Sequence, residues 1–170
     1  SSDLSATAET TITVLPLPSV TITASNSSVC AGGSVLLSAS GAVSYTWSPS
    51  NGLSATAGNT VIATPTVTTT YTVTGASAQG CQNTSQVTIT VNSANISLTG
   101  AATICEGQST ALTASGGTTY KWYPASSLYT TSAATTLIDP TQSYATVYAK
   151  PSATTTYQVS GTDASGCSAR

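Results

Sequence analysis

The chain lacks histidine and methionine altogether, and only eight of its 170 residues are charged. Without histidine, the most common general base of enzymes is missing. Serine and threonine are abundant, but none lies in a sequence context that would activate its hydroxyl as a nucleophile. We therefore predict that the protein is not an enzyme.

Ligands for a metal ion or a cofactor are equally scarce. There is no Cys-x-x-Cys pair, and the five carboxylates are scattered, without the Asp-x-Asp-x-Asp-Gly run that wraps calcium. Asp163 lies near the Gly166-Cys167 turn, where it could meet an ion, but a turn-forming aspartate is the favoured interpretation. We expect no metal and no cofactor.

Charge and hydropathy argue against two further partners. A formal net charge of −2 is unsuited to nucleic acid, because phosphates require Lys and Arg for neutralisation. No apolar run reaches the length of a membrane span and no signal peptide is recognisable, so membrane insertion is not expected. Because methionine is absent, we expect a processed or internal segment of a longer product.

What the chain has in abundance is hydroxyl and β-branched side chains. Serine and threonine make up more than a third of the sequence, and valine and isoleucine are common. Disordered chains usually combine low hydrophobicity with high net charge, and this chain has neither. Since β-branched residues favour strands, the composition predicts an all-β protein with hydroxyls on its outer face.

An internal repeat divides the chain into two units. In each unit the alternation of residues turns a Tyr and a Trp inward together, on Tyr45 and Trp47 and again on Tyr120 and Trp122. Short strands, frequent turn residues and an inward Trp predict two immunoglobulin-like β-sandwiches in a linear array. The repeated segments are residues 29–41 with 104–116, 45–49 with 120–124, and 68–81 with 154–167.

The two units differ at their ends. The first finishes with residues 87–91, where Val, Ile and Val alternate with Thr, whereas the second has no such strand. Residues 11–14 repeat the pattern of residues 88–91, so we predict that they complete the second unit of a neighbouring copy. This complementation involves Thr11, Ile12, Thr13 and Val14 of one copy and Tyr157 and Val159 of the next.

The predicted organisation has three parts. Residues 1–17 hold the complementing strand and a linker, residues 18–92 the first domain, and residues 93–170 the second. Proline stiffens the linker at residues 15–18. The copies are either separate subunits or tandem repeats of one long chain, and both arrangements give the same local structure.

The four cysteines fall at equivalent places in the two units, which predicts disulfides and an extracellular location. Repeat logic favours pairing within each domain, Cys30 with Cys81 and Cys105 with Cys167. Topology opposes it, because these corners lie at opposite ends of an immunoglobulin sandwich, too far apart for a bridge. The alternative pairs Cys30 with Cys167 and leaves Cys81 and Cys105 for neighbouring units.

The motifs together resemble a known family. Cys-x-Gly-x-Ser, Tyr-x-Trp-x-Pro, Thr-Thr-Tyr-x-Val and Gly-Cys occur in this order in both units. This set is similar to the immunoglobulin-like or PKD-like repeats of giant surface proteins of Bacteroidetes, including gliding-motility adhesins exported by the type IX secretion system. The resemblance implies a cell-surface or secreted repeat with a structural or adhesive role, and it brings no catalytic residues.

Two functions are consistent with these features. The first is a structural subunit of an extracellular fibre or stalk, with identical neighbouring units as partners. The alternative is an adhesive module that binds glycans or surfaces, such as an extracellular polysaccharide, through an insertion at residues 125–143 of the second unit. Tyr129 and Asp139 are the candidate surface contacts in that insertion.

Overall fold

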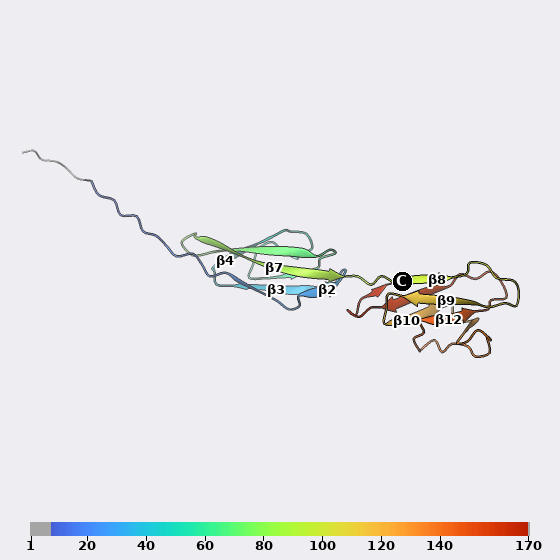
Figure 1. Ribbon diagram of the computed structural model, residues 1–170. Helices are drawn as coiled ribbons and strands as arrows, with labels where there is room; N and C mark the ends of the chain where they lie inside the picture. Colours follow the sequence, from blue (N-terminus) through green and yellow to red (C-terminus); the bar gives the residue numbers. More distant parts are fainter. Residues whose placement is uncertain (1–7, 170) are drawn as a thin grey trace, which may run out of the picture. The chain divides into compact units, whose positions relative to one another are not determined.

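The computed structural model describes residues 8–169, which contain fourteen β-strands and no α-helix. The prediction of an all-β protein is therefore confirmed. Within these residues there is accordingly no helix with the length and apolar character needed to span a membrane. Residues 8–20, which precede the first strand, form no regular element (Figure 1).

The first repeat folds into two facing sheets. One sheet has the strand order β1-β3-β5, and the other has the order β2-β7-β6-β4. All neighbouring strands are antiparallel except β2 and β7, which run parallel. The strands are β1 (Thr21–Ala24), β2 (Ser28–Cys30), β3 (Val35–Ser40), β4 (Ser44–Ser48), β5 (Thr60–Ala63), β6 (Thr69–Ala76) and β7 (Gln82–Asn92).

This strand order is that of an immunoglobulin-like sandwich. When β1 and β2 are counted as one strand, the first, second and fourth strands pair in one sheet, and the third, fifth and sixth pair in the other. The first strand is split, because β1 pairs with β3 while β2 crosses to the opposite sheet and pairs with β7. The predicted immunoglobulin-like fold is present in this unit.

The inner faces of the two sheets form the first core. Trp47, Tyr71 and Ile89 are buried there, as the alternation along their strands predicted. The indole Nε1 of Trp47 donates a hydrogen bond to the Gly58 carbonyl oxygen at 2.8 Å, so its one polar group is satisfied inside the core. Trp47 is thus a core residue.

The second repeat builds a similar sandwich, in which β13 and β14 are shorter than their equivalents β6 and β7. One sheet has the order β11-β12-β9-β8 and the other β10-β13-β14. Trp122 is buried and donates from Nε1 to the Tyr144 carbonyl oxygen at 2.8 Å, in parallel with Trp47. The strands are β8 (Ser97–Gly100), β9 (Thr110–Ser115), β10 (Thr119–Tyr123), β11 (Leu128–Tyr129), β12 (Thr146–Ala149), β13 (Gln158–Thr162) and β14 (Ser168–Ala169).

The chain clusters into two compact units that do not follow the repeat residue by residue. The segments Ser28–Gly33 and Thr66–Thr68, both from the first repeat, belong to the second unit. The second unit also takes the end of β7, because it continues from Thr90. Ser28–Gly33 carries β2 and Cys30, so this segment matters for the cysteine pairing described below.

Candidate functional site: an open strand position in the second unit

The last strand of the first repeat shows what a completed sandwich contains. β7 pairs antiparallel with β6, with Ile89 opposite Thr69. Its end also pairs parallel with β2, with Val91 opposite Val29. The strand thus lies between two neighbours, and Ile89 is fully buried beneath it.

The same position in the second repeat is open along most of its length. β14 pairs with β13 only at Gly161 and Thr162. Residues 103–105 correspond to β2 and residues 155–157 to the start of β6, yet neither segment forms a strand in the described chain. A strand added here would therefore have two edges to pair with.

A pocket of about 400 Å³ lies beside these two segments in the second unit. Among the residues that line it are Ile104, Leu112, Ala149 and Tyr157. Three of them correspond to Leu37, Ala63 and Tyr71 in the first repeat, which are completely buried. The pocket therefore falls where the completed sandwich has solid core.

Tyr157 shows the consequence for a single side chain. Its equivalent, Tyr71, donates a hydrogen bond from its hydroxyl to the Asn51 carbonyl oxygen at 3.1 Å. The hydroxyl of Tyr157 is enclosed but has no hydrogen-bond partner. Burial is the main cause of the raised pKa of Tyr157. Tyr157 therefore lies at the edge of an unfinished core.

The predicted donor residues are solvent-exposed in the isolated chain. Ile12 is 83% exposed and Val14 is 89% exposed, and residues 11–14 form no strand. An apolar, alternating segment is thus presented in the same molecule that has an open strand position. The earlier part of the predicted 1–17 segment, residues 1–7, lies outside the described residues.

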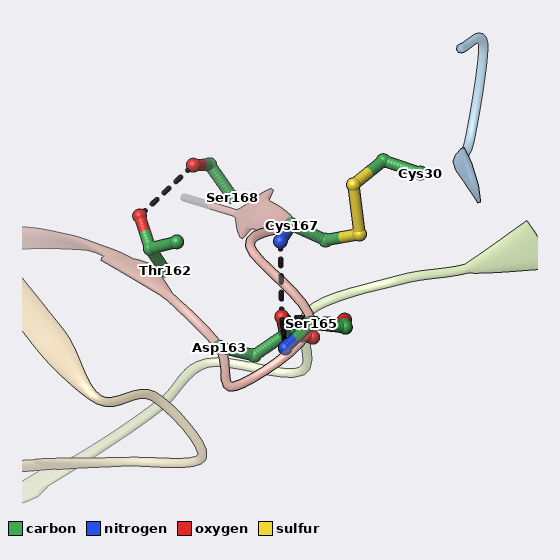
Figure 2. Close-up of a disulfide and its surroundings, with 6 residues drawn as sticks. All are labelled: Cys30, Thr162, Asp163, Ser165, Cys167 and Ser168. Carbon is green, nitrogen blue, oxygen red and sulfur yellow. Dashed lines mark hydrogen bonds between the residues drawn. A yellow bond between two sulfur atoms is a disulfide. The ribbon is translucent and has the colours of Figure 1, made fainter. Parts of the chain in front are cut away.

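The cysteine pairing that repeat logic favours is wrong. Cys30 bonds to Cys167 (Figure 2), with their Cα atoms 5.4 Å apart. Cys81 and Cys105 carry free thiols. The topological objection explains the error. In an immunoglobulin sandwich, the two corners that hold the cysteines of one unit lie at opposite ends, too far apart for a bridge. The segment Ser28–Gly33 belongs to the second unit, so the observed bond lies within that unit.

Asp163 orders the turn that carries Cys167 (Figure 2). Its Oδ1 accepts hydrogen bonds from the Ser165 hydroxyl at 2.7 Å, from the Ser165 amide at 2.9 Å and from the Cys167 amide at 3.0 Å. The bond from the Ser165 hydroxyl is the main cause of the lowered pKa of Asp163. These contacts agree with a turn-forming role, and no group of three or more metal-ligating side chains occurs among residues 8–169.

The insertion at residues 125–143 is anchored to the second core. Leu128 and Ile138 are buried in that core, while Leu137 between them is exposed. Tyr129 is half-buried and pairs with Leu137. Asp139 accepts hydrogen bonds from both the amide and the hydroxyl of Thr141, which lower the pKa of its carboxyl. The two candidate surface residues are thus partly engaged in the insertion's own structure.

Sequence reasoning named Tyr157 and Val159 as the acceptor but did not identify the opposite edge of the site. That edge is the segment around Ile104, the equivalent of Val29 in β2. The parallel pairing of a short first strand with the last strand leaves no periodic signal, because only three residues take part. Once β2 is known, the alignment of the two repeats locates this edge at residues 103–105.

No family model matches this chain, and no curated protein matches it. The solved structures that are similar to it include the following two. Murine CEACAM1b is 17% identical, with a TM-score of 0.36, over 83% of this chain and 90% of that one. A C-terminal 282-residue fragment of intimin, solved with the intimin-binding domain of the translocated intimin receptor, is 20% identical, with a TM-score of 0.41, over 88% of this chain and 61% of that one. Because both scores are low, the fold assignment rests on the strand order.

Proposed function

We propose that the protein is a structural subunit of an extracellular fibre, in which residues 11–14 of one copy fill the open strand position of the next. The observation that carries this proposal is the coincidence of three features in one chain. A strand position is open, a pocket lies beside it, and an exposed segment repeats the sequence of the strand that fills the equivalent position.

The first repeat supplies the expected register. By equivalence with Ile89 and Thr88, Ile12 would pair opposite Thr155 and Thr11 opposite Thr156. By equivalence with Val91, Val14 would pair in parallel opposite Ile104. The donor strand would then have a neighbour on each side, as β7 has in the first repeat.

The energetic gain is centred on Ile12. Ile89 is fully buried in the first repeat, so Ile12 would pass from 83% exposed to buried on joining. Full burial of such a side chain contributes about 1.5–3 kcal/mol, and each new backbone hydrogen bond about 1 kcal/mol. A strand of this length can therefore supply a stable joint without any charged contact.

Two arrangements of copies satisfy the proposal, namely separate subunits that exchange strands and tandem repeats of one longer polypeptide. The Cys30–Cys167 disulfide supports a location in an oxidising compartment or outside the cell, where such bonds persist. The mass of the native material after boiling with reductant distinguishes the arrangements, since separate subunits dissociate and tandem repeats do not.

The test compares the full chain with a variant that lacks residues 1–14. By light scattering coupled to size exclusion, the full chain is expected to form concentration-dependent polymers, and the truncated variant to remain monomeric. Because residues 8–14 are exposed and lie outside the strands, their removal leaves both cores intact. A synthetic peptide of residues 5–18 should bind the truncated variant and raise its melting temperature.

Ile12→Asp provides the matched control within the full chain. An aspartate at this position would bury a charge in the acceptor core, so polymerisation should be lost. Glu9→Gln changes a neighbouring charge on the same segment and should leave polymerisation intact. Polymers that persist in the truncated variant or in Ile12→Asp would exclude strand complementation.

The adhesive alternative draws on one feature, the exposure of Leu137 beside Tyr129. Deletion of residues 125–143 cannot test it, because Leu128 and Ile138 are part of the core. The suitable variant is Leu137→Ser, with binding to extracellular polysaccharide measured by pull-down. Loss of binding with an unchanged melting curve would favour adhesion through the insertion.

A further inference from the structure

The observed disulfide joins β2 to a turn within the second compact unit. Cys30, at the end of β2, lies opposite Asn92 at the end of β7. Cys167 lies in the turn between β13 and β14. The bond therefore connects the residue beside the end of a last strand with the hairpin turn of the next repeat along the chain.

Each of these cysteines has an equivalent that carries a free thiol. Cys105 corresponds to Cys30 and is exposed, and Cys81 corresponds to Cys167 and is partly buried. The turns around Cys81 and Cys167 have the same hydrogen bonds. The Ser77 amide donates to the Cys81 carbonyl oxygen, and the Ser77 hydroxyl oxygen accepts from the Cys81 amide. The amide and the carboxylate of Asp163 make the same two bonds with Cys167.

At the proposed joint, Cys105 would lie opposite the end of a last strand, as Cys30 lies opposite the end of β7. If Val14 occupies the place of Val91 opposite Ile104, the next residue, Leu15, takes the place of Asn92 and lies opposite Cys105. The connector that follows is almost the same length in both cases. Eight positions lead from Ile89 to the start of β8 at Ser97, and nine lead from Ile12 to the start of β1 at Thr21.

We infer that Cys105 of one copy forms a disulfide with Cys81 of the copy whose residues 11–14 complete its second unit. This inference rests on the proposed function, and it adds a covalent bond to each joint. The donor strand and its connector would then bring the hairpin turn of Cys81 to Cys105, in the manner of the bond between Cys30 and Cys167. Every cysteine of an assembled chain is then paired.

The bond forms by thiol–disulfide exchange with a small disulfide oxidant. The Cys105 and Cys81 thiols lose two protons and two electrons and join through one S–S bond. The oxidant, such as oxidised glutathione, takes up both protons and electrons and leaves as two thiols. The exposure of Cys105 gives the oxidant access to the first thiol before the next copy arrives.

The test uses two full-length variants, Cys81→Ser and Cys105→Ser, with oxidised glutathione as the oxidant. Neither variant alone retains both partners, so each should give monomers on a non-reducing denaturing gel. Mixed together, they should give a disulfide-linked dimer that contains a peptide joining Cys105 to Cys81. The wild-type chain should give a ladder that reductant collapses to the monomer.

A double variant, Cys30→Ser with Cys167→Ser, is the control, because it keeps both free thiols and should keep the ladder. Light scattering of the same samples under native, reducing conditions reports strand complementation separately. Native polymers without the Cys105–Cys81 peptide, or with only symmetric Cys105–Cys105 and Cys81–Cys81 bonds, would overturn this inference and leave the proposed function standing. Absence of native polymers overturns both.

Discussion

At the scale of single residues, neighbours on one strand have opposite roles. Trp122 is buried in the second core, and Lys121, the residue before it, is exposed on the outer face. Trp122→Ala should lower the free energy of unfolding by about 3–5 kcal/mol, because it leaves a cavity and removes a large apolar surface. Lys121→Ala should change it by no more than about 0.5 kcal/mol. Chemical denaturation measures both, and equal effects would contradict the inward placement of Trp122.

The carboxyl of Asp163 provides a prediction that depends on pH. Hydrogen bonds from Ser165 and from the backbone of its turn favour the charged form, so the pKa in the folded protein lies below the ordinary value for aspartate. A lowered pKa means that the carboxylate stabilises the fold above the unfolded pKa, and that this contribution is lost as the pH falls through the folded pKa. A carboxyl ¹³C titration should give Asp163 and Asp139 midpoints below the ordinary value for aspartate. A normal midpoint for Asp163 would contradict the turn geometry.

At the scale of elements, most strands could be predicted because their inward residues alternate. The repeated segments 29–41 and 104–116 contain β3 and β9, whose inward residues alternate. The repeated segment 154–167 contains β13, which starts at Gln158, one residue after Tyr157. In the first repeat, the equivalent Tyr71 lies within β6 and pairs with Val87 of β7. The alternation of residues along the sequence indicates which face of the sheet a side chain occupies. Whether the backbone forms a strand depends on a neighbouring strand that can pair with it.

This difference leads to a prediction about backbone amides. In the first repeat, residues 69–71 lie in β6 and pair with β7, whereas residues 155–157 form no strand in the isolated chain. On assembly, residues 155–157 and 103–105 should become protected from hydrogen exchange, because the donor strand would pair with both segments. Residues 69–71 should already be protected before assembly.

The Ile12→Asp variant serves as the reference for this measurement. It keeps the acceptor sequence unchanged, so any protection that arises without complementation should appear in it as well. Exchange at residues 155–157 that is slow in this variant, or that stays fast in wild-type polymers, would contradict the proposed register. Slow exchange in the wild type alone would locate the donor strand at this edge.

At the scale of the whole molecule, the repeat could predict the units but not the cysteine pairs. Equivalent sequence positions suggested one bond in each domain, yet Cys30 bonds to Cys167 across 137 residues. A repeat reports which residues occupy the same place in two units, and two such places need not lie near each other within one unit. The insertion shows a similar limit, because its surface residues were visible in the sequence whereas its buried anchors, Leu128 and Ile138, were not identified.

The low charge of the chain determines how the proposed fibre should respond to salt. Among the described residues, the charged residues nearest in sequence to the donor strand and to the pocket lining are Glu9, Glu106 and Lys150, and neither glutamate has an oppositely charged residue close to it in sequence. The joint would be held by backbone hydrogen bonds between neutral groups and by the burial of Ile12, neither of which is screened by ions. Sulfate, which strengthens apolar burial, should tighten it.

We therefore expect the dissociation constant of the peptide of residues 5–18 for the truncated variant to change by less than about threefold between 0.05 and 1 M sodium chloride. Ammonium sulfate at equal ionic strength should lower that constant. Fluorescence anisotropy of a labelled peptide measures both effects, with the Ile12→Asp peptide as the non-binding control. A tenfold loss of affinity in sodium chloride would show that charged residues, and not the apolar strand, hold the joint together.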